Sequence, residues 1–525
     1  MSSTRSADPV EVDGRTLSLE DVERVARGAG AVLASEARDR MQAARDVVRR
    51  ALSEDRVVYG VTTGFGRLSD TRIPTERIAE LQVNLVRSHA AGVGEPLSAE
   101  TVRAMILLRA NALATGRSGV RPLIVDRLIG LLDSGVIPHV PRQGSVGASG
   151  DLAPLAHLAL VLIGEGRARL GNDKWVDGET ALARANLEPV RLQAKEGLAL
   201  VNGTQLTTSI GALTLLRAER ILQAVEIAGA LSLEAIRGTR AALSEEVHAA
   251  RPHPGQVESA RRLRSLLGEA SEIGDSHHEC GRVQDPYSIR CMPQVHGTVR
   301  DALGYVRRTL EREVNAATDN PLVFAESGGA DPSGVERNEN GRVVSGGNFH
   351  AAPVATALDL LAIVMVDLAS ISERRVNVLM DPDFSRLPAF LAPEPGLQSG
   401  FMMQQVTAAA LVSESKGLAH PASVDSIPTS ANKEDHVSMG PWAARKAERI
   451  VTNADRVVAI ELLAAAQGID LLRPLRTSPA LESVHQVIRE HVPRWTDDRS
   501  ASADIEMVVE MVQGGSLARA SGRET

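Results

Sequence analysis

Long runs of alanine- and leucine-rich sequence constrain the fold of this chain more than any other feature. Within each run apolar residues recur three and four positions apart, which is the spacing of helices that bury a face. Several runs are longer than the average helix of a globular protein. The runs cover residues 206–236, 299–316, 355–369, 404–418 and 442–466. They predict a mainly α fold with a bundle of long helices at the centre of the chain.

The most apolar run, residues 355–369, is interrupted by Asp359 and Asp367. Carboxylates are costly in the core of a bilayer, so the run predicts a buried bundle helix rather than a membrane span.

The formal net charge of the chain is −8. A chain with this charge balance is not expected to have nucleic acid or an anionic membrane as its main partner.

The cysteine content indicates a reducing compartment. Cys280 and Cys291 are the only two cysteines in 525 residues, too few for a disulfide framework. The first residues lack the apolar core of a signal peptide. We therefore expect a cytoplasmic protein.

The first part of the chain is less regular than the centre. Strand-like pieces such as 56–59 alternate there with helical patterns and glycine-rich turns. We expect a mixed N-terminal region over residues 1–197, followed by the long-helix bundle and a C-terminal helical region over residues 198–525. Residues 328–341 are rich in Gly, Asp, Asn and Glu and predict an exposed loop.

The tripeptide Ala148-Ser149-Gly150 has the composition of a backbone-derived electrophile. In a tight turn the amide nitrogen of Gly150 can attack the carbonyl carbon of Ala148. Loss of water from the new ring and from the Ser149 side chain then leaves a methylidene-imidazolone. Gly150 has no Cβ to hinder its nitrogen, and Ser149 carries a hydroxyl that can be eliminated.

The residues after the tripeptide predict a helix over 152–163. Asp151 can cap that helix, and Pro154 falls in its first turn. The positive end of the helix would then stabilise negative charge on the ring. The alternative is that Ala-Ser-Gly is an ordinary loop triplet ahead of a helix.

Tyrosines are rare in this chain, so their positions are informative. Only three occur in 525 residues. Tyr59 begins the glycine-rich segment 59–66, which lacks the Gly-Lys-Ser/Thr ending of a phosphate-binding loop. Tyr287 lies in the segment 284–297. The alternative role for either tyrosine is half-buried packing.

These motifs together resemble the family of histidine and aromatic amino acid ammonia-lyases, which form a 4-methylidene-imidazol-5-one (MIO) group from Ala-Ser-Gly. The resembling segments follow one another in order over residues 59–66, 81–94, 144–154, 201–204, 284–297, 318–321, 347–350 and 419–439. The resemblance covers most of the chain and is greatest to the histidine-acting members. It implies a fumarase/aspartase-like architecture and an MIO group formed from Ala148, Ser149 and Gly150, without an external cofactor. It also implies a homotetramer whose sites draw residues from more than one subunit.

The resemblance implies a small amino acid as the partner and the non-oxidative deamination of L-histidine to trans-urocanate and ammonia. The MIO group makes the amine a better leaving group, and a base must take a proton from the β-carbon. By resemblance Tyr59 is that base, and the catalytic set is Ala148, Ser149, Gly150, Tyr59 and Tyr287. The substrate-binding set is His89, Asn202, Gln284, Arg290, Phe349 and Glu434. In this set the forked guanidinium of Arg290 suits the substrate carboxylate.

Two positions bear on the choice of substrate. Glu434 stands where relatives acting on phenylalanine or tyrosine usually have glutamine, and a carboxylate suits an imidazole N–H. His89 matches histidine-acting members, although some tyrosine-specific relatives also carry it. Lys433 and Ala351 depart from the glutamine and glycine frequent in histidine-acting members.

Other functions remain open on the sequence. A tyrosine or phenylalanine ammonia-lyase, or a 2,3-aminomutase, would use the same MIO group. A non-catalytic relative acting as a scaffold is a third class, against which the presence of Tyr59, the tripeptide, Tyr287 and Arg290 argues.

One segment contains metal-ligand residue types. It reads His277-His278-Glu279-Cys280. Side chains of neighbouring residues tend to diverge, and no second cluster has the spacing of a zinc site. We expect a loop and no metal.

Overall fold

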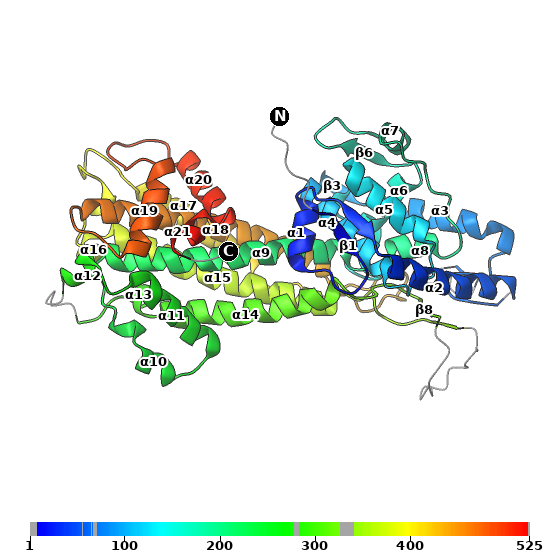
Figure 1. Ribbon diagram of the computed structural model, residues 1–525, viewed down its shortest axis with the longest axis horizontal. Helices are drawn as coiled ribbons and strands as arrows, with labels where there is room; N and C mark the ends of the chain where they lie inside the picture. Colours follow the sequence, from blue (N-terminus) through cyan, green and yellow to red (C-terminus); the bar gives the residue numbers. More distant parts are fainter. Residues whose placement is uncertain are drawn as a thin grey trace. The chain divides into compact units, whose positions relative to one another are not determined.

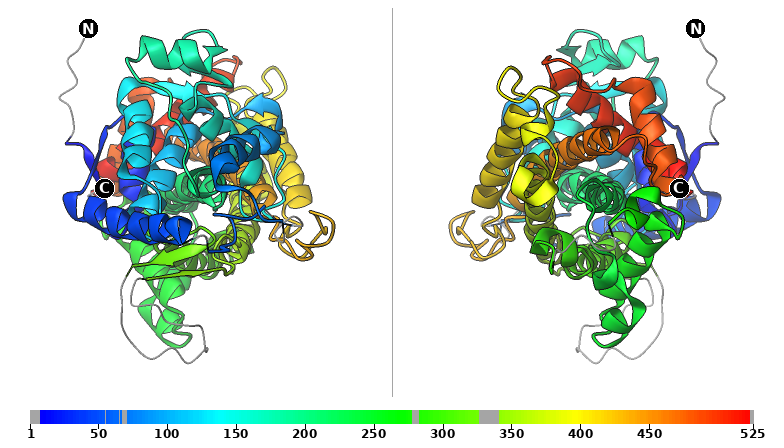
Figure 2. Two further views of the ribbon diagram at one scale, coloured as in Figure 1. Left: turned by 90° about the vertical axis from the view of Figure 1, so that its right-hand side faces the viewer. Right: turned by 90° about the vertical axis from the view of Figure 1, so that its left-hand side faces the viewer.

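The computed structural model of the chain describes residues 8–54, 56–64, 66, 71–277, 283–325 and 341–522. Helices dominate these residues (Figures 1 and 2). The contacts divide the chain into two compact units. Unit 1 comprises Met1–Leu213, Arg307–Leu358 and Pro421–Arg445, and unit 2 comprises Thr214–Val306, Asp359–His420 and Lys446–Thr525. The mainly α fold class is confirmed. Each unit is built from three separate stretches of sequence. The expected division of the chain at residue 197 stays a prediction.

All five predicted helical runs are helices, labelled in Figure 1. They are α9 (Gln205–Ala235), α14 (Met292–Glu313), α15 (Ala352–Met380), α17 (Met402–Leu418) and α18 (Gly440–Leu471). Among the described residues only α15 is long and apolar enough to cross a membrane, and 72% of its most apolar window is buried inside the protein. It is a core helix, as its two aspartates predict.

Buried polar contacts join the long helices within unit 2. Arg375 of α15 forms a fully buried ion pair with Glu461 of α18, with Nε and Oε1 2.6 Å apart. Ser232 of α9 donates a hydrogen bond to the same carboxylate at 2.9 Å. Arg300 of α14 pairs with buried Glu226 of α9 at 2.6 Å. Loss of one partner would leave an uncompensated buried charge, so these contacts stabilise one arrangement of the helices.

Shorter helices complete unit 2. They are η3 (Ala241–Leu243), α10 (Glu245–Ala249), α11 (Pro254–Leu267), α12 (Glu272–Asp275), α13 (Tyr287–Arg290), α16 (Pro382–Ser385), η4 (Ala389–Leu391), α19 (Pro479–His491), α20 (Ser502–Gln513) and α21 (Ser516–Ala520). Pro254 and Pro479 open their helices at positions where the missing N–H costs nothing.

Unit 1 contains a helix, α4 (Ala99–Ala114), that is buried on all sides from Thr101 onward. Ser98 caps it by accepting a hydrogen bond from the Thr101 backbone N–H at 3.2 Å. The other helices in the first 201 residues are α1 (Leu19–Ala26), α2 (Ser35–Ser53), η2 (Thr75–Arg77), α3 (Ile78–His89), α5 (Pro122–Ser134), α6 (Leu152–Leu162), α7 (Gly178–Arg184) and α8 (Glu196–Val201). The buried residues of α4 include Arg103, Arg109 and Asn111 as well as apolar ones, so other parts of the chain cover this helix on every face.

The strands of unit 1 are short and form small separate sheets. β1 (Val10–Val12) pairs in parallel with β2 (Ala31–Leu33), with Val10 opposite Ala31. The antiparallel pairs join β3 (Val93–Pro96) to β5 (Pro141–Gln143), β4 (Val136–Pro138) to β6 (Arg167–Leu170), β6 to β7 (Val176–Asp177), and β8 (Leu322–Phe324) to β9 (Arg342–Val344). The mixed character expected of the N-terminal region is therefore present.

The predicted strand-like piece 56–59 is wrong. Residues 59–62 form turns, in which the Val61 and Thr62 amides both donate to the Val58 carbonyl. The Thr62 hydroxyl also donates to the Arg56 carbonyl at 2.9 Å. These local bonds compete with pairing to another strand. The predicted loop 328–341 falls, except for its last residue, outside the described residues.

Four connections within unit 1 each end at the start of a helix and carry polar residues. They are residues 144–151 before α6, 202–204 before α9, 345–351 before α15 and 429–439 before α18. Their contacts with one another build the site described next.

Candidate active site

The Ala148-Ser149-Gly150 turn is tightly enclosed by main chain. Gly150 adopts φ +78° and pairs with Gly203 in a parallel bridge. A Cβ at Gly150 would overlap the carbonyl of Gly203, and one at Gly147 would overlap the Ser438 hydroxyl. Only glycine meets both the positive φ and the close approach at these positions. The turn is therefore confined from two sides.

The Ser145 side chain ties the two ends of the turn together. Its Oγ accepts a hydrogen bond from the Gly147 N–H at 3.1 Å and donates to the Gly150 carbonyl at 3.3 Å. The Ser438 Oγ donates to the Gly147 carbonyl at 3.3 Å, and the Met439 N–H donates to the Val146 carbonyl at 3.0 Å. These bonds hold the backbone of the tripeptide in a compact shape.

The starts of four helices lie close to this turn. α6 follows it directly, and the Gly150–Gly203 bridge brings the start of α9 beside it. An ideal Cβ on Gly440, the first residue of α18, lies 3.1 Å from both Ala351, just before α15, and Thr207 of α9. Because helix N-termini carry partial positive charge, their convergence favours negative charge on groups in the turn.

Asp151 differs from its predicted role. It stands at the N-cap position of α6, but its side chain does not cap that helix. One carboxylate oxygen accepts from the Thr207 N–H at 2.8 Å and the other from the Thr207 hydroxyl at 3.0 Å, so Asp151 satisfies the start of α9 instead. Complete burial raises the pKa of Asp151 to about 7. The backbone at Asp151 is not extended (ψ 54°), unlike that of an ordinary N-cap residue.

A cavity of about 500 Å³ in unit 1 opens onto the turn. Its lining includes Tyr59, Ser149, Asn202, Phe349 and Glu434, all predicted from the sequence. The Asn202 side-chain amide donates to the Ser149 carbonyl at 3.1 Å. The backbone N–H of Gly66 donates to the Tyr59 hydroxyl oxygen at 3.3 Å. The structure therefore brings five predicted site residues to one cavity.

A second cavity of about 670 Å³ shares Tyr59, Gly66, Ser149, Asn202 and Glu434 with the first. Its remaining lining is largely apolar and comprises Gly64, Thr71, Ile73, Leu81, Asn84, Leu85, Ser88, His89, Leu152, Leu198, Ser430 and Ala431. His89 Nδ1 lies 2.9 Å from the Leu85 carbonyl. The Ser88 hydroxyl lies 3.1 Å from the same nitrogen. A carbonyl can only accept, so a hydrogen bond to Leu85 requires the proton on Nδ1 and leaves Nε2 of the neutral ring as an acceptor.

Both carboxylate oxygens of Glu434 accept hydrogen bonds. Oε1 accepts from the Ser149 hydroxyl and Oε2 from the Thr429 hydroxyl, each at 2.7 Å. The Thr429 and Glu434 backbones also exchange two hydrogen bonds across a short turn, at 2.9 and 3.3 Å. Three of the four residues between them, 430–432, have positive φ although none is glycine. This left-handed turn directs the carboxylate at Ser149.

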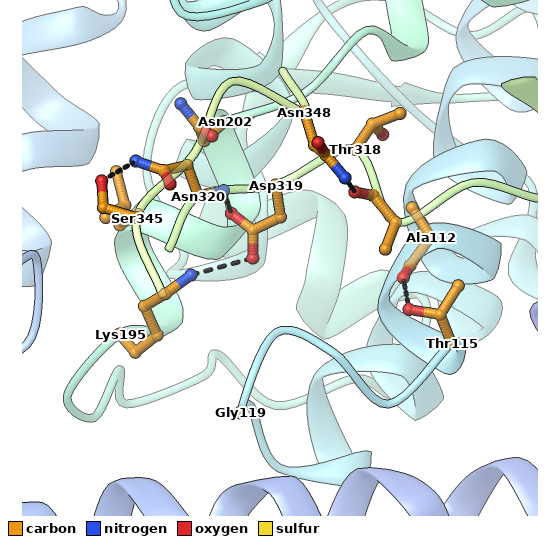
Figure 3. Close-up of polar contacts among 12 residues, drawn as sticks. Ala112, Thr115, Gly119, Lys195, Asn202, Thr318, Asp319, Asn320, Ser345 and Asn348 are labelled. Atoms are coloured by element: carbon orange, nitrogen blue, oxygen red, sulfur yellow. Dashed lines mark hydrogen bonds and ion pairs between the residues drawn. The ribbon is translucent and has the colours of Figure 1, made fainter. Parts of the chain in front are cut away.

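A layer of buried polar side chains in unit 1 includes Lys195, Asp319 and Asn320 (Figure 3). Lys195 precedes α8 and pairs with Asp319 at 2.8 Å, both side chains being fully buried. Asp319 also accepts from the Asn320 N–H at 2.7 Å. Asn320, which lines the smaller cavity, then bonds to Ser345 and Gly346 through its own amide.

Arg109 of α4 completes this layer. Its Nη1 donates to the Asn202 carbonyl at 2.8 Å and to Gln205 Oε1 at 3.0 Å. The guanidinium is fully buried, and burial lowers its pKa to about 10, partly offset by Asp319. Sequence reasoning gave no role to Arg109, Lys195, Asn320 or Thr429. The signals were that Asn320 and Thr429 lie in the family-like segments 318–321 and 419–439.

Gln284, Tyr287 and Arg290 lie elsewhere in the chain. They belong to unit 2, in and just before α13, whereas the described residues lining both cavities belong to unit 1. Arg290 donates to the Gln284 side chain at 3.1 Å and lies 4.4 Å above the Tyr287 ring. Tyr287 is 71% exposed. These three predicted residues are therefore grouped with one another within unit 2.

No group of three metal-ligand side chains occurs among the residues the structure describes. His277 directs Nδ1 at the Ile273 carbonyl (2.8 Å) and Nε2 at the Gly238 carbonyl (3.1 Å). His278, Glu279 and Cys280 lie outside the described residues. The absence of a metal stays a prediction for that segment.

Comparison with known proteins identifies the class of this site. The sequence pattern of the aromatic amino acid lyase family matches residues 17–490. The chain belongs to that family. Within it, the chain is 54% identical over 515 residues to histidine ammonia-lyase of Anaeromyxobacter sp. (strain K), which covers 96% of this chain and 99% of that protein.

Solved structures agree with this assignment. A histidine ammonia-lyase from Trypanosoma cruzi superposes with a TM-score of 0.89 at 45% identity, covering 98% of this chain and 95% of that one. A tyrosine aminomutase from Streptomyces globisporus superposes with a TM-score of 0.90 at 38% identity, covering 98% and 99%. Relatives named for two different activities, an ammonia-lyase and an aminomutase, therefore share this fold.

Proposed function

We propose that this protein is an ammonia-lyase that converts L-histidine to trans-urocanate and ammonia. The observation that carries the proposal is the Ser149–Glu434 contact, which sets the tripeptide beside a carboxylate suited to an imidazole. The 54% identity to a histidine ammonia-lyase over nearly the whole chain supports the same substrate.

The residues of the turn fit an MIO group formed from Ala148, Ser149 and Gly150. Enclosure by Gly203 and the Ser145 bridge keep the Gly150 nitrogen and the Ala148 carbonyl within one compact turn. The Ser149 carbonyl, which such a ring would retain, already accepts a hydrogen bond from Asn202. When formed, the group supplies an electrophilic carbon that turns the substrate amine into a good leaving group.

The roles of the chain's own residues follow from their positions. Tyr59 faces both cavities and is the base that takes the β-proton, and the Gly66 N–H on its oxygen stabilises negative charge there. Asn202 and the converging helix starts stabilise charge on the Ser149 carbonyl oxygen. Phe349 packs beside the substrate.

Recognition of the imidazole is assigned to two acceptors. Glu434 faces the shared part of the cavities, and His89 lines the larger one with Nε2 as an acceptor. Imidazole offers N–H donors to such groups, whereas a phenylalanine ring offers none.

We further propose a cytoplasmic homotetramer in which Gln284, Tyr287 and Arg290 reach the cavity from other copies of the chain. The family resemblance implies this arrangement. It agrees with the exposure of Tyr287 and with an Arg290 that has no carboxylate within ion-pair distance among the described residues. Arg290 would then hold the substrate carboxylate.

The test is to mix purified protein with L-histidine, without added cofactor, and to measure urocanate and ammonia, with L-tyrosine and L-phenylalanine in parallel. We expect urocanate from histidine and little turnover of the other two. The alternative of an aromatic amino acid lyase predicts the corresponding acrylate instead, and a 2,3-aminomutase predicts a β-amino acid. Either of these products as the main one would refute the proposal.

A further inference from the structure

Glu434 contacts a hydroxyl that must disappear if the MIO group forms. Its Oε1 accepts from the Ser149 Oγ at 2.7 Å, while its Oε2 is occupied by Thr429. With both oxygens bonded, the carboxylate cannot rotate without losing a hydrogen bond. The Ser149 hydroxyl is thereby fixed in one direction before any chemistry takes place.

The turn that carries Glu434 is built to keep this contact. Residues 430–432 all lie in the left-handed region, which non-glycine residues seldom adopt and which persists only where the surroundings enforce it. The two backbone bonds between Thr429 and Glu434 close the turn. The left-handed backbone of this turn orients the Glu434 carboxylate toward Ser149.

We propose that Glu434 is a positioning residue for the formation of the electrophile, holding the Ser149 hydroxyl in the conformation from which it is eliminated. The inference rests on the proposed function, because it concerns the MIO group on which that function depends. It gives Glu434 a task that precedes any encounter with substrate.

The elimination explains why one orientation matters. The Cα proton of Ser149 passes to solvent, and its electron pair becomes the π bond between Cα and Cβ. The Cβ–Oγ bond breaks, and the oxygen takes up a proton and leaves as water, so the step neither oxidises nor reduces the residue. The two σ bonds must overlap in the transition state, which only some rotamers of Ser149 allow. Glu434 selects one of them by accepting from Oγ.

The same step prepares Glu434 for its later role. Once the Ser149 oxygen has left, Oε1 has lost its donor while Oε2 is still held by Thr429. A carboxylate oxygen facing the cavity is then open to a substrate N–H. Substrate recognition would therefore become complete only in chains whose electrophile has formed.

The test measures the mass of the full-length protein at successive times after a short pulse of synthesis. Formation of the MIO group makes the chain lighter by two water molecules. The wild type is compared with Glu434→Ala, Glu434→Gln and Thr429→Val. Asp435→Ala removes an exposed carboxylate from the same segment and is the matched control.

We expect Glu434→Ala to form the doubly dehydrated chain roughly ten- to a hundredfold more slowly than the wild type, because the Ser149 hydroxyl loses the acceptor that fixes its direction. Glu434→Gln keeps an acceptor oxygen and should stay within about threefold of the wild type. Thr429→Val removes the hydrogen bond to Oε2, so its dehydration rate should lie between those of the two Glu434 variants. Asp435→Ala should form the doubly dehydrated chain at the wild-type rate. Thermal melting of each variant checks that it has folded.

Two results would overturn the inference. One is dehydration of Glu434→Ala at the wild-type rate, and the other is a Glu434→Gln rate as low as that of Glu434→Ala. If Glu434→Ala does not fold, a wild-type rate in Thr429→Val would overturn it equally. A wild-type chain that never loses two water molecules would instead refute the MIO group and with it the proposed function.

Discussion

At the scale of single residues, Ser149 has the most demanding role. Among the described residues its side chain hydrogen-bonds to Glu434 alone, so removing the hydroxyl should disturb packing little. We predict that Ser149→Ala abolishes turnover of histidine, because the exocyclic double bond can no longer form. Its melting temperature should stay close to that of the wild type. Substantial activity in this variant, measured as urocanate release, would contradict the assignment of the tripeptide.

Glu434 tests substrate recognition separately. We predict that Glu434→Gln lowers kcat/KM for histidine by roughly ten- to a hundredfold, because a charged acceptor for the imidazole N–H becomes a neutral one. Any residual turnover of tyrosine should fall much less. Steady-state kinetics on both substrates check this, and equal losses would mean that Glu434 does not recognise the ring.

Asp151 should give the stability of the protein a particular dependence on pH. Burial raises its pKa from 3.8 to about 7 in the folded protein. Between these values the folded state binds the proton more tightly than the unfolded state. The contribution of Asp151 to stability is therefore fully present below about pH 4 and is lost as the pH rises towards 7.

We predict that Asp151→Asn reduces the fall in melting temperature between pH 5 and pH 8 relative to the wild type. The comparison isolates Asp151, because Asp455, whose pKa is raised to about 6 by burial, is present in both proteins. Melting temperatures that fall in parallel in the two proteins would show that Asp151 does not titrate in this range.

At the scale of elements, the buried Lys195–Asp319 pair connects the start of α8 to the segment before β8. Burial lowers the pKa of Lys195, and Asp319 opposes that effect. We predict that Lys195→Met destabilises the protein by about 3–5 kcal/mol, because Asp319 is left charged and buried. Adding Asp319→Asn should restore part of this loss.

Thermal melting of the single and double variants checks the pair, with Arg77→Ala as the control. Arg77 and Glu80 form an exposed pair of helical spacing, with side chains 66% and 53% exposed. Such exposed pairs contribute little to the free energy of unfolding. A Lys195→Met protein as stable as Arg77→Ala would contradict the structural role of the buried pair.

The sequence predicts long helices well and local backbone poorly. Helices such as α9 and α18 begin within a few residues of the predicted runs, because helical spacing over many residues is a strong signal. Asp151 was expected to cap α6, yet it bonds to Thr207, since a residue at a helix start can serve whichever helix approaches it. The left-handed residues 430–432 leave no sequence signal, as none is glycine.

The site residues show the same contrast between what the sequence predicts and what only the fold shows. Motif resemblance located Tyr59, Ser149, Asn202, Phe349 and Glu434, which share one cavity. The supporting layer of Arg109, Lys195 and Asp319 was missed, because a buried charge cannot be told from a surface charge without the fold. Its role becomes visible only through the hydrogen bonds it makes.

At the scale of the whole molecule, the predicted site is divided between the two units of the chain. Gln284, Tyr287 and Arg290 belong to unit 2, while the cavities are lined by unit 1. Sequence order gives no information on this division. The proposed homotetramer would unite the two groups through different copies of the chain.

Complementation tests this proposal. Tyr59→Phe and Arg290→Ala should each be nearly inactive alone. Co-expressed in equal amounts, they should form mixed oligomers with about a quarter of the wild-type activity, because random assembly leaves that share of sites with both residues intact. No recovered activity in oligomers shown to be mixed would mean that Tyr59 and Arg290 act within one chain.

Every catalytic role assigned above depends on the conversion of Ala148-Ser149-Gly150 into an electrophile. The most direct measurement is the fragment mass of the tryptic peptide spanning residues 143–167 from active wild-type protein. The loss of two water molecules, located by fragmentation to residues 148–150, is the predicted result. A peptide of unmodified mass from protein that releases urocanate would contradict it.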